Sequence, residues 1–360
     1  MNRPDGCRYN CPGCRYIDLP YEKSLKLKFQ FLQKNLKKWE DKIHDIRFSE
    51  SKILKYRKKV ILNVKFEDLW VFGMVVKDNV LDISSCPIHH DIVTKTINLF
   101  KKILPPYQQF PLHFYLQYDR QVALILKTKE KNDCEWMKDY YSEFEKIGLD
   151  GIWVHHNPSA GKRIFEKTPL YLVYGKEYSM NELNFYYSIG AFQQLIPKLY
   201  FDSLNETKIF FNNNDDYNIV DLYSGAGTSL KLWSSFTDVV GVELNGMSYK
   251  MALLNAPLAT ILRGKCSERL PQINLWIDKH NNKKINLFVN PPRIGIEKEV
   301  VDWILSTEKI YKIAYLSCSP GTLLRDLEKL SQKYKIYKII PYDFFPFTHH
   351  IETLVLMKKL

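Results

Sequence analysis

Residues 218–228 carry the feature that most restricts how this chain can fold: an apolar run, a turn that contains Gly225 and Gly227, and then a helical pattern. This is how a buried parallel strand enters a turn at the rim of an α/β sheet, where glycines let the backbone approach a ligand closely. A second apolar run, residues 239–242, ends in Glu243, at about the 20-residue distance at which an acid meets the ribose hydroxyls of a bound nucleotide. The sequence therefore predicts a βαβ unit that binds a nucleotide-like ligand.

The spacing of the glycines narrows the choice of ligand. Residue 230 is a leucine, so the third glycine of the dinucleotide-binding fingerprint is missing, which argues against NAD. The pattern Asp-x3-Gly-x-Gly that starts at Asp221 is instead the form used by folds that bind S-adenosylmethionine. We therefore expect S-adenosylmethionine as the cofactor. The alternative is a purely structural βαβ unit with a solvated Glu243.

Three further candidate residues are predicted near the same rim. The run 286–290 ends in Asn290-Pro-Pro, and because proline cannot continue a sheet, the Asn290 side chain is left free to bond a ligand. The run 313–317 ends at Cys318, ahead of a helical pattern. A helix dipole stabilises a thiolate at its N-terminus and makes it a nucleophile, whereas a buried cysteine acting as a small hydrophobe is the alternative. Glu352 opens the last predicted strand.

A cysteine cluster with the spacing C-x3-C-x2-C stands near the N-terminus, at Cys7, Cys11 and Cys14, and Cys86 is the best candidate for a fourth ligand. Thiolates packed this tightly suit a [4Fe–4S] cluster or a structural zinc ion, and spacing alone does not separate the two. Radical enzymes that use S-adenosylmethionine share this spacing, but the repeated βα units that they need after the loop are not apparent. Three unpaired thiols are the remaining interpretation.

The chain is basic, with a formal net charge of +12 and a pI of about 9.1. A polyanionic partner is the natural inference, with nucleic acid ahead of membrane, although a merely solvated basic surface has the same composition. The sequence has no apolar run at its N-terminus and no stretch as long as a membrane span. We therefore expect a cytoplasmic protein without a membrane partner, acting as a monomer.

Hydrophobic periodicity divides the chain into two parts. Residues 1–180 are predicted to form an α+β domain with a mostly antiparallel sheet, which includes a basic amphipathic helix over 21–43. The polar segment 176–184 breaks this pattern, and residues 181–360 are predicted to form an α/β domain with a Rossmann-like, seven-stranded, mostly parallel sheet. The expected strands of the first part cover residues 60–66, 70–76, 113–118, 122–127, 151–155 and 170–174, and its other helices cover 91–104 and 132–147.

These motifs together resemble those of the iron–sulfur RNA (uracil-5-)-methyltransferases, and most closely the bacterial 23S rRNA branch that lacks an N-terminal TRAM domain. Each motif is modestly specific alone, but their order and spacing together are highly specific. The resemblance implies a class I methyltransferase domain that uses S-adenosylmethionine to make 5-methyluridine in RNA, most of all in 23S rRNA. Its carriers are the C-x3-C-x2-C cluster with Cys86-Pro87, Tyr56-Arg57, AFQQLIP at 191–197, DLYSGAG at 221–227, VNPPR at 289–293, SCSPGT at 317–322 with Arg325-Asp326, and FPFTHHIE at 345–352.

The family roles carry over by motif. By this resemblance, Cys318 is the nucleophile that adds to the uracil ring, and Glu352 is the base that removes its C5 proton. The implied S-adenosylmethionine and uracil sites contain Gln194, Tyr223, Gly225, Glu243 and Asn290, and the implied [4Fe–4S] ligands are Cys7, Cys11, Cys14 and Cys86.

Three departures from the family affect contacts to S-adenosylmethionine rather than the chemistry. Ile196 stands where the family usually has asparagine. Cys266 or its neighbours replace an acid often found near the adenine, and Ser224 stands where many members have cysteine.

Three other functions stay open at this point. A uracil-5 methyltransferase acting on tRNA shares the cysteine and the His-x-Glu ending, whereas the N-terminal cysteines favour rRNA. An RNA cytosine-5 methyltransferase also places a cysteine in such a turn, but it carries another after the proline of the fourth strand, where this chain has Pro292 and Arg293. A non-catalytic RNA-binding metal module would bind no S-adenosylmethionine.

Overall fold

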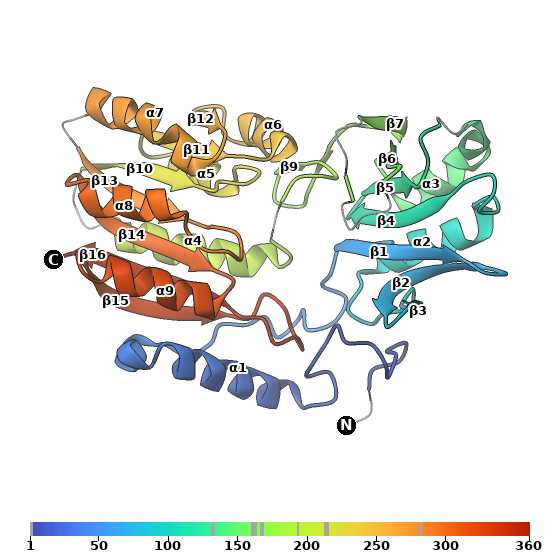
Figure 1. The fold of residues 1–360 in the computed structure, drawn as a ribbon, viewed down its shortest axis with the longest axis horizontal. Helices are drawn as coiled ribbons and strands as arrows, with labels where there is room; N and C mark the ends of the chain where they lie inside the picture. Colours follow the sequence, from blue (N-terminus) through green and yellow to red (C-terminus); the bar gives the residue numbers. More distant parts are fainter. Residues whose placement is uncertain are drawn as a thin grey trace. The chain divides into compact units, whose positions relative to one another are not determined.

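The computed structural model describes residues 3–130, 134–159, 164–165, 169–192, 194–211, 216–280 and 283–360 (Figure 1). The chain divides into two compact units. The first contains the chain up to Asp18 and Ser51–Ile189, and the second contains Leu19–Glu50 and Gly190–Leu360. The sequence predicted a single boundary near residue 180. The structure instead assigns residues 19–50 to the second unit, because Leu32 and Leu36 are fully buried in the core of that unit.

The second unit is built on a seven-stranded sheet with the order β12-β11-β10-β13-β14-β16-β15. The sheet is mixed: β16 runs antiparallel to both of its neighbours, and the other neighbouring strands are parallel. The predicted Rossmann-like α/β architecture is therefore confirmed, with one reversed strand. Its strands are β10 (Tyr217–Leu222), β11 (Val239–Glu243), β12 (Thr260–Arg263), β13 (Lys284–Val289), β14 (Ile310–Ser317), β15 (Tyr334–Tyr342) and β16 (Glu352–Lys359).

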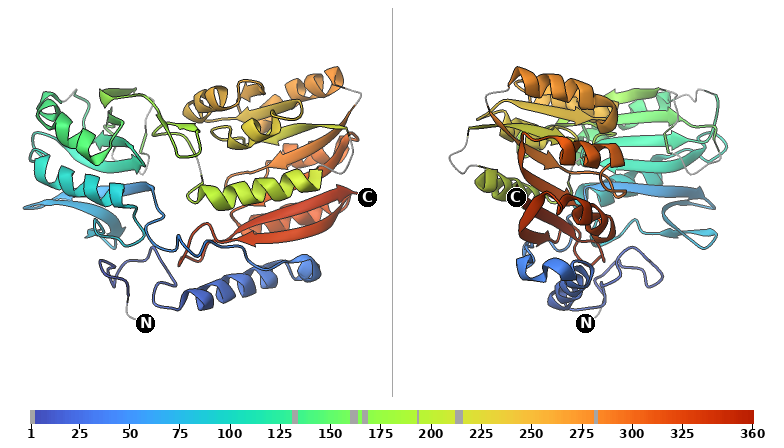
Figure 2. Two further views of the ribbon diagram at one scale, coloured as in Figure 1. Left: turned by 180° about the vertical axis from the view of Figure 1, so that it is seen from behind. Right: turned by 60° about the vertical axis from the view of Figure 1, so that its left-hand side comes forward.

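The central strands are continuous apolar runs because helices cover both faces of the sheet. Every residue of β10 is buried, and so is every residue of β13 after Lys284. Figures 1 and 2 show α4 on one face and α8 and α9 on the other. The helices of this layered unit are α4 (Pro197–Phe211), α5 (Thr228–Trp233), α6 (Gly246–Asn255), α7 (Cys266–Lys279), α8 (Lys298–Ser306) and α9 (Pro320–Leu330).

The second unit also includes an N-terminal strap, residues 19–50. It contains α1 (Tyr21–Asn35), which packs beside α9, and a 3₁₀ turn over Lys37–Lys42 (Figures 1 and 2). The sequence predicted one helix over 21–43. The α-helix ends earlier because the chain next joins the sheet, where the N–H groups of His44 and Arg47 each donate to a carbonyl of β15 at 2.8 Å. The strap therefore covers the edge of β15.

The first unit contains a second seven-stranded sheet, with the order β3-β2-β1-β4-β5-β6-β7. The β5–β6 pair is parallel and the other pairs are antiparallel, as the α+β prediction requires. The predicted helix over 132–147 lies partly outside the described residues, and its described part is a 3₁₀ turn (Glu135–Tyr140) followed by α3. The elements are β1 (Lys59–Phe66), β2 (Trp70–Val76), β3 (Asn79–Asp82), α2 (Asp91–Ile103), β4 (Leu112–Tyr118), β5 (Gln121–Leu126), α3 (Tyr141–Ile147), β6 (Gly151–His156), β7 (Leu170–Gly175) and a small β8–β9 pair (Ser179–Met180 and Tyr186–Tyr187).

A search of the described helices for a membrane span finds none that is both long and apolar enough.

Candidate active site

The carboxyl ends of β10, β11, β13 and β14 meet at one edge of the second unit's sheet, because these strands are parallel and follow one another in the sheet. Tyr223 and Gly225 follow β10, Glu243 ends β11, Asn290 follows β13 and Cys318 follows β14. The topology alone thus brings most of the residues predicted for this unit to one rim.

Glu243 closes the glycine turn from the neighbouring strand. Its Oε2 accepts the N–H of Gly225 at 2.8 Å, and its Oε1 accepts the N–H of Asn245 at 2.6 Å. Burial raises the pKa of this carboxyl, and the N–H donors oppose that rise. A carboxylate accepts about four hydrogen bonds, so Glu243 retains acceptor capacity for the hydroxyl groups of a ligand.

Gly227 is required for the close approach of the turn to α6. Its φ is +81°, and a Cβ atom built there would lie 2.8 Å from the Cα of Ala252. A side chain at this position would therefore meet both an unfavourable backbone conformation and a backbone clash.

Tyr223 adopts a left-handed backbone conformation with φ 62°. Its hydroxyl accepts the N–H of Glu297 at 3.3 Å and lies 3.5 Å from the Glu297 carboxylate. Burial, together with the neighbouring Cys266 thiol, raises the pKa of Tyr223 well above its usual range. The hydroxyl is thus bonded within the protein, and the Tyr223 side chain packs against the core of the second unit.

Gln194 lies buried in the short segment before α4. Two residues earlier, the carbonyl oxygen of Phe192 lies 3.6 Å from the position of a Cβ at Gly225, and the Phe192 N–H donates to Ser248 Oγ at 3.1 Å. Residue 193 is outside the described residues. Gln194 is therefore two residues from a contact with the glycine turn.

Tyr200 on α4 is a further candidate residue that the sequence analysis missed. It is buried, and its hydroxyl lies near the side chains of Asn290 and Ser229. Burial and the charge of Asp221 raise the pKa of Tyr200 above its usual range, and Glu352 adds to the effect. No motif marks this residue, and α4 itself was not predicted, so the sequence offered no signal beyond an aromatic residue after Gln194.

Cys318 and Glu352 come together because β14 and β16 are antiparallel partners. Ser317 pairs with Thr353, so the next pair in the same register is Cys318 with Glu352. The charge of Glu352 acts on the Cys318 thiol, and the Arg293 guanidinium acts on both groups. The predicted nucleophile, the predicted base and a cation therefore share one end of the sheet.

Burial controls the protonation of this pair. It raises the pKa of Cys318 to about 11, assisted by the charge of Glu352 and opposed by Arg293. It also raises the pKa of Glu352 to about 8, again opposed by Arg293. Among the described residues, Glu352 Oε2 has no hydrogen-bond partner. At neutral pH the resting pair is therefore a thiol and a carboxylic acid.

The low thiol pKa expected from the helix dipole is thus wrong for the resting protein. Cys318 precedes α9, Pro320 is the first residue of that helix, and Ser319 occupies the N-cap position. The Ser319 side chain makes no capping hydrogen bond, and Thr322 Oγ1 donates to carbonyls rather than accepting an N–H. Desolvation is the largest cause of the raised pKa of the thiol.

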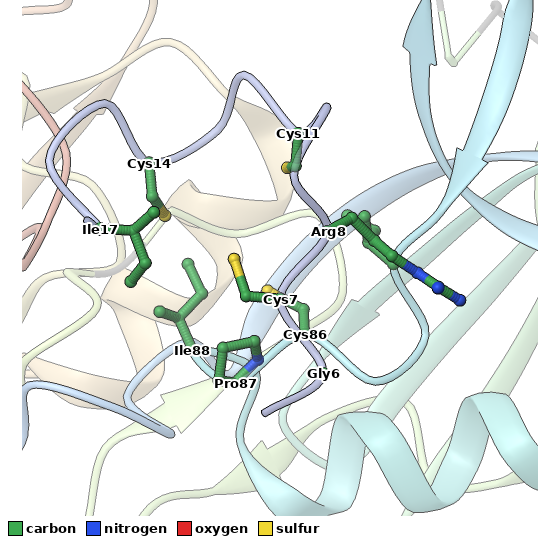
Figure 3. A pocket seen from close by; sticks show the side chains of 10 residues that line it. Gly6, Cys7, Arg8, Cys11, Cys14, Ile17, Cys86, Pro87 and Ile88 are labelled. Atoms are coloured by element: carbon green, nitrogen blue, oxygen red, sulfur yellow. The ribbon is translucent and has the colours of Figure 1, made fainter. Parts of the chain in front are cut away.

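The four cysteines predicted as cluster ligands line one pocket of the first unit (Figure 3). Cys7, Cys11 and Cys14 come from the N-terminal segment and Cys86 from the loop between β3 and α2, and all four are free thiols. Within the described part of the chain, however, no group of three or more histidine, cysteine, aspartate or glutamate side chains is arranged as a metal site. The four thiols therefore share one pocket, but the described residues are not arranged as a preformed metal site.

A comparison with protein families covers almost the whole chain. The family model described as tRNA (Uracil-5-)-methyltransferase matches residues 20–360. The chain belongs to the tRNA (uracil-5-)-methyltransferase family. The predicted enzyme class, an RNA methyltransferase, is confirmed by this match.

Two curated relatives align with nearly the whole of this chain. An uncharacterized RNA methyltransferase of Bacteroides thetaiotaomicron is 24% identical over 396 residues, covering 97% of this chain and 86% of the relative. One from Protochlamydia amoebophila is 28% identical over 387 residues, covering 98% of this chain and 83% of the relative. The crystal structure of Pyrococcus abyssi tRNA (uracil-54, C5)-methyltransferase in complex with S-adenosyl-L-homocysteine has a similar fold, with a TM-score of 0.73, 21% identity and coverage of 97% of this chain and 86% of that chain.

Membership of the tRNA (uracil-5-)-methyltransferase family supports two partners predicted from the motifs. A methyl donor at the glycine turn, expected to be S-adenosylmethionine, agrees with membership of a methyltransferase family. The basic composition is that of a protein with an RNA substrate.

Proposed function

We propose that this protein transfers the methyl group of S-adenosylmethionine to C5 of a uridine in RNA through a covalent bond between Cys318 and C6 of the uracil. The observation that carries the proposal is the placement of Cys318 opposite Glu352, with Arg293 acting on both, at the strand ends that carry the glycine turn. Nucleophile and base then reach the uracil from two adjacent strands.

The proposed roles account for each change at the uracil ring. The Cys318 thiolate adds to C6, and the electron pair of the C5–C6 double bond makes C5 nucleophilic. C5 then bonds the methyl group that bound S-adenosylmethionine would supply. The sulfur–methyl bond of the donor breaks, and S-adenosylhomocysteine leaves with its electron pair. Glu352 then takes the C5 proton, the electrons of that C–H bond restore the double bond, and the sulfur–C6 bond breaks to release 5-methyluridine and the thiolate.

Arg293 is the group that can bring the resting pair into its reactive ionisation states. It lowers the pKa of both Cys318 and Glu352. A uracil bound beside Arg293 keeps water out of the site and strengthens this electrostatic effect. We propose that Arg293 stabilises the thiolate and then the carboxylate.

The methyl donor is proposed to bind at the glycine turn. Gly225 and Gly227 allow its close approach, Glu243 accepts from its ribose hydroxyls, and Tyr223 and Gln194 complete the wall of the site. Asn290, held beside Tyr200, is proposed to bond the uracil edge. The contacts that support this assignment are those of Gly225 with Glu243 and with the Phe192 carbonyl.

For the RNA, we propose 23S rRNA as the first substrate, because the sequence resembles that branch of the family. tRNA is the second candidate, favoured by the family description and by the fold shared with the Pyrococcus abyssi enzyme. The two candidates are distinguished by offering the purified enzyme each transcript separately and measuring which one it methylates. We propose that the protein is cytoplasmic and monomeric. Size-exclusion chromatography with light scattering checks the oligomeric state.

We further propose that Cys7, Cys11, Cys14 and Cys86 hold a [4Fe–4S] cluster with a structural role. Four free thiols in one pocket form a donor set that suits such a cluster, and the pocket's Ile17, Ile83 and Ile88 supply apolar walls. Iron and sulfide analysis of anaerobically purified protein tests this, with Cys86→Ala as the comparison. Stoichiometric zinc, or no metal, contradicts it.

The catalytic proposal is tested with RNA that carries 5-fluorouridine, whose C5–F bond blocks the last step and traps the adduct. Wild-type protein with S-adenosylmethionine should give a protein–RNA band that survives denaturing electrophoresis. Cys318→Ala should give no band and no methylation. Full activity in Cys318→Ala refutes the proposal.

A further inference from the structure

A buried ion pair ties the strap to the loop that leads into β16. Lys28 on α1 donates from Nζ to Asp343 Oδ1 at 2.6 Å, and both side chains are 0% exposed. Tyr21 on the same helix donates its hydroxyl to Asp343 Oδ2 at 2.7 Å. Both carboxylate oxygens are thus bound by α1. We call Tyr21, Lys28 and Asp343 the anchor cluster, and residues 343–351 the base loop.

Hydrogen bonds extend from the anchor cluster almost to Glu352. Lys28 also donates to the carbonyl of Phe345 at 2.9 Å, and that carbonyl accepts the N–H of Thr348 at 3.1 Å and its hydroxyl at 2.8 Å. Thr348 Oγ1 in turn accepts the N–H of His350 at 3.2 Å. Glu352 begins β16 two residues later. The position of Lys28 is therefore linked step by step to the backbone that carries Glu352.

The turn inside the base loop is also held by α1. The ring centroids of Tyr21 and Phe347 are 5.3 Å apart, and Phe347 has a left-handed backbone with φ 61°. Such a conformation persists only where the surroundings determine it. The contact with Tyr21 thus holds a backbone shape that a free loop would leave.

A buried ion pair contributes little net stability to the packing of α1. Taking both charges out of water costs about as much as their attraction returns, so well-packed apolar residues would stabilise the fold at least as well. The two hydrogen bonds to the Asp343 carboxylate are directional. They therefore define the position of the base loop, which apolar packing alone would not do.

We propose that the anchor cluster is a positioning device for the base, so that Lys28, Tyr21 and Asp343 hold Glu352 where it can take the C5 proton. This inference rests on the proposed function. The inference assigns the anchor cluster to one step, the removal of the C5 proton, which follows sulfur addition and methyl transfer. A displaced Glu352 leaves the sulfur–C6 bond unbroken, because that bond breaks only when the electrons of the C5–H bond return to the ring. The methylated RNA then stays attached to Cys318.

The test uses Tyr21→Phe, Asp343→Asn and Lys28→Met in the full-length protein. With uridine RNA and S-adenosylmethionine we expect turnover to fall by up to about 100-fold, the effect of moving a catalytic group by about 1 Å. The denaturation-resistant protein–RNA adduct should accumulate, as in Glu352→Gln. With 5-fluorouridine RNA, where the base step is absent, the rate of adduct formation should equal that of the wild type.

Two matched controls separate positioning from general destabilisation. Lys26→Met changes an exposed lysine of the same helix. Lys312→Met removes a buried lysine whose Nζ donates to the carbonyls of Phe210 and Phe211 at the end of α4. Neither should accumulate adduct with uridine RNA. Tyr21→Phe removes a single hydroxyl, so this variant still tests the inference if Lys28→Met does not fold.

The inference is overturned if the anchor variants lose turnover and 5-fluorouridine adduct formation in parallel, or if their turnover is unchanged. Absence of any adduct from the wild-type protein with 5-fluorouridine RNA instead contradicts the proposed function.

Discussion

The carboxylate of Glu243 bonds the backbone N–H of Gly225 at 2.8 Å, so the acid expected to receive a ribose also holds the turn against which the ligand would lie. One side chain therefore connects β11 with the loop after β10. Its removal affects both the shape of the turn and the contacts available to the ligand.

Glu243→Ala is expected to weaken S-adenosylmethionine binding. It removes the acceptor for the ribose hydroxyls and leaves the N–H of Gly225 without its carboxylate partner. A lost hydrogen bond to a charged group costs about 1.5–3 kcal/mol, which corresponds to a loss of affinity of roughly 10- to 100-fold. Isothermal titration calorimetry measures this, and Glu299→Ala, in the first turn of α8, is the control. Equal affinities in the two variants would contradict the assignment.

The pH dependence of turnover should follow the ionisation of Glu352. Its pKa is raised to about 8 by burial, and only the ionised carboxylate can accept the C5 proton. When proton removal limits the rate, kcat should rise with pH and level off at or slightly below about pH 8, because a bound uracil strengthens the effect of Arg293, which lowers this pKa. Glu352→Asp retains a titrating base but moves it back, so its kcat should be lower at every pH. A flat profile from pH 6 to 9 would exclude Glu352 as the rate-limiting base.

Stability should fall with rising pH because of the same carboxyl. Its pKa is about 8 in the folded protein and 4.5 for an unperturbed glutamate, so between these values the folded state retains a proton that the unfolded state has released. The contribution of Glu352 to the free energy of unfolding therefore decreases from about pH 4.5 to about pH 8.

Glu352→Gln should remove this contribution and be more stable than the wild type at pH 8, by on the order of 4 kcal/mol. Asp221, whose pKa burial raises to about 7, contributes with the same sign, so the pH dependence is reduced rather than abolished. Urea unfolding at pH 5 and pH 8 measures both effects. A variant as pH-sensitive as the wild type would show that Glu352 is ionised when folded.

Gly227→Ala should destabilise the second unit. The new Cβ would lie 2.8 Å from the Cα of Ala252, at a φ of +81°. Overpacking and an unfavourable φ together cost about 2–4 kcal/mol. Gly321→Ala is the matched control, because nothing lies within 4 Å of its Cβ position. Thermal unfolding should separate the two clearly, and similar melting temperatures would argue against a close approach at Gly227.

The rim of the second unit could be predicted because each of its residues follows an apolar strand. Gly225, Glu243, Asn290 and Cys318 are marked by a run of buried residues that ends in a turn, and parallel topology then brings them to one edge. The placement of these residues at one edge can therefore be predicted from the order of the strands and their local sequence pattern, without knowledge of tertiary contacts.

Three features depended on contacts that no local pattern encodes. Tyr200 becomes a site residue only because α4 brings it to Asn290. The thiol pKa of Cys318 is set by burial beside Glu352, which the helix-dipole argument alone does not include. The assignment of residues 19–50 to the second unit depends on Leu32 and Leu36, whose buried partners lie far along the chain.

The ion pair between Lys28 and Asp343 joins residues 315 positions apart. During synthesis, α1 leaves the ribosome long before α9, the helix that it packs beside, has been made. Its apolar face has to wait for that helix, while the intervening residues up to Ile189 can already form a unit of their own. A polypeptide that ends before α9 thus carries an unprotected amphipathic helix, a natural recognition element for a chaperone.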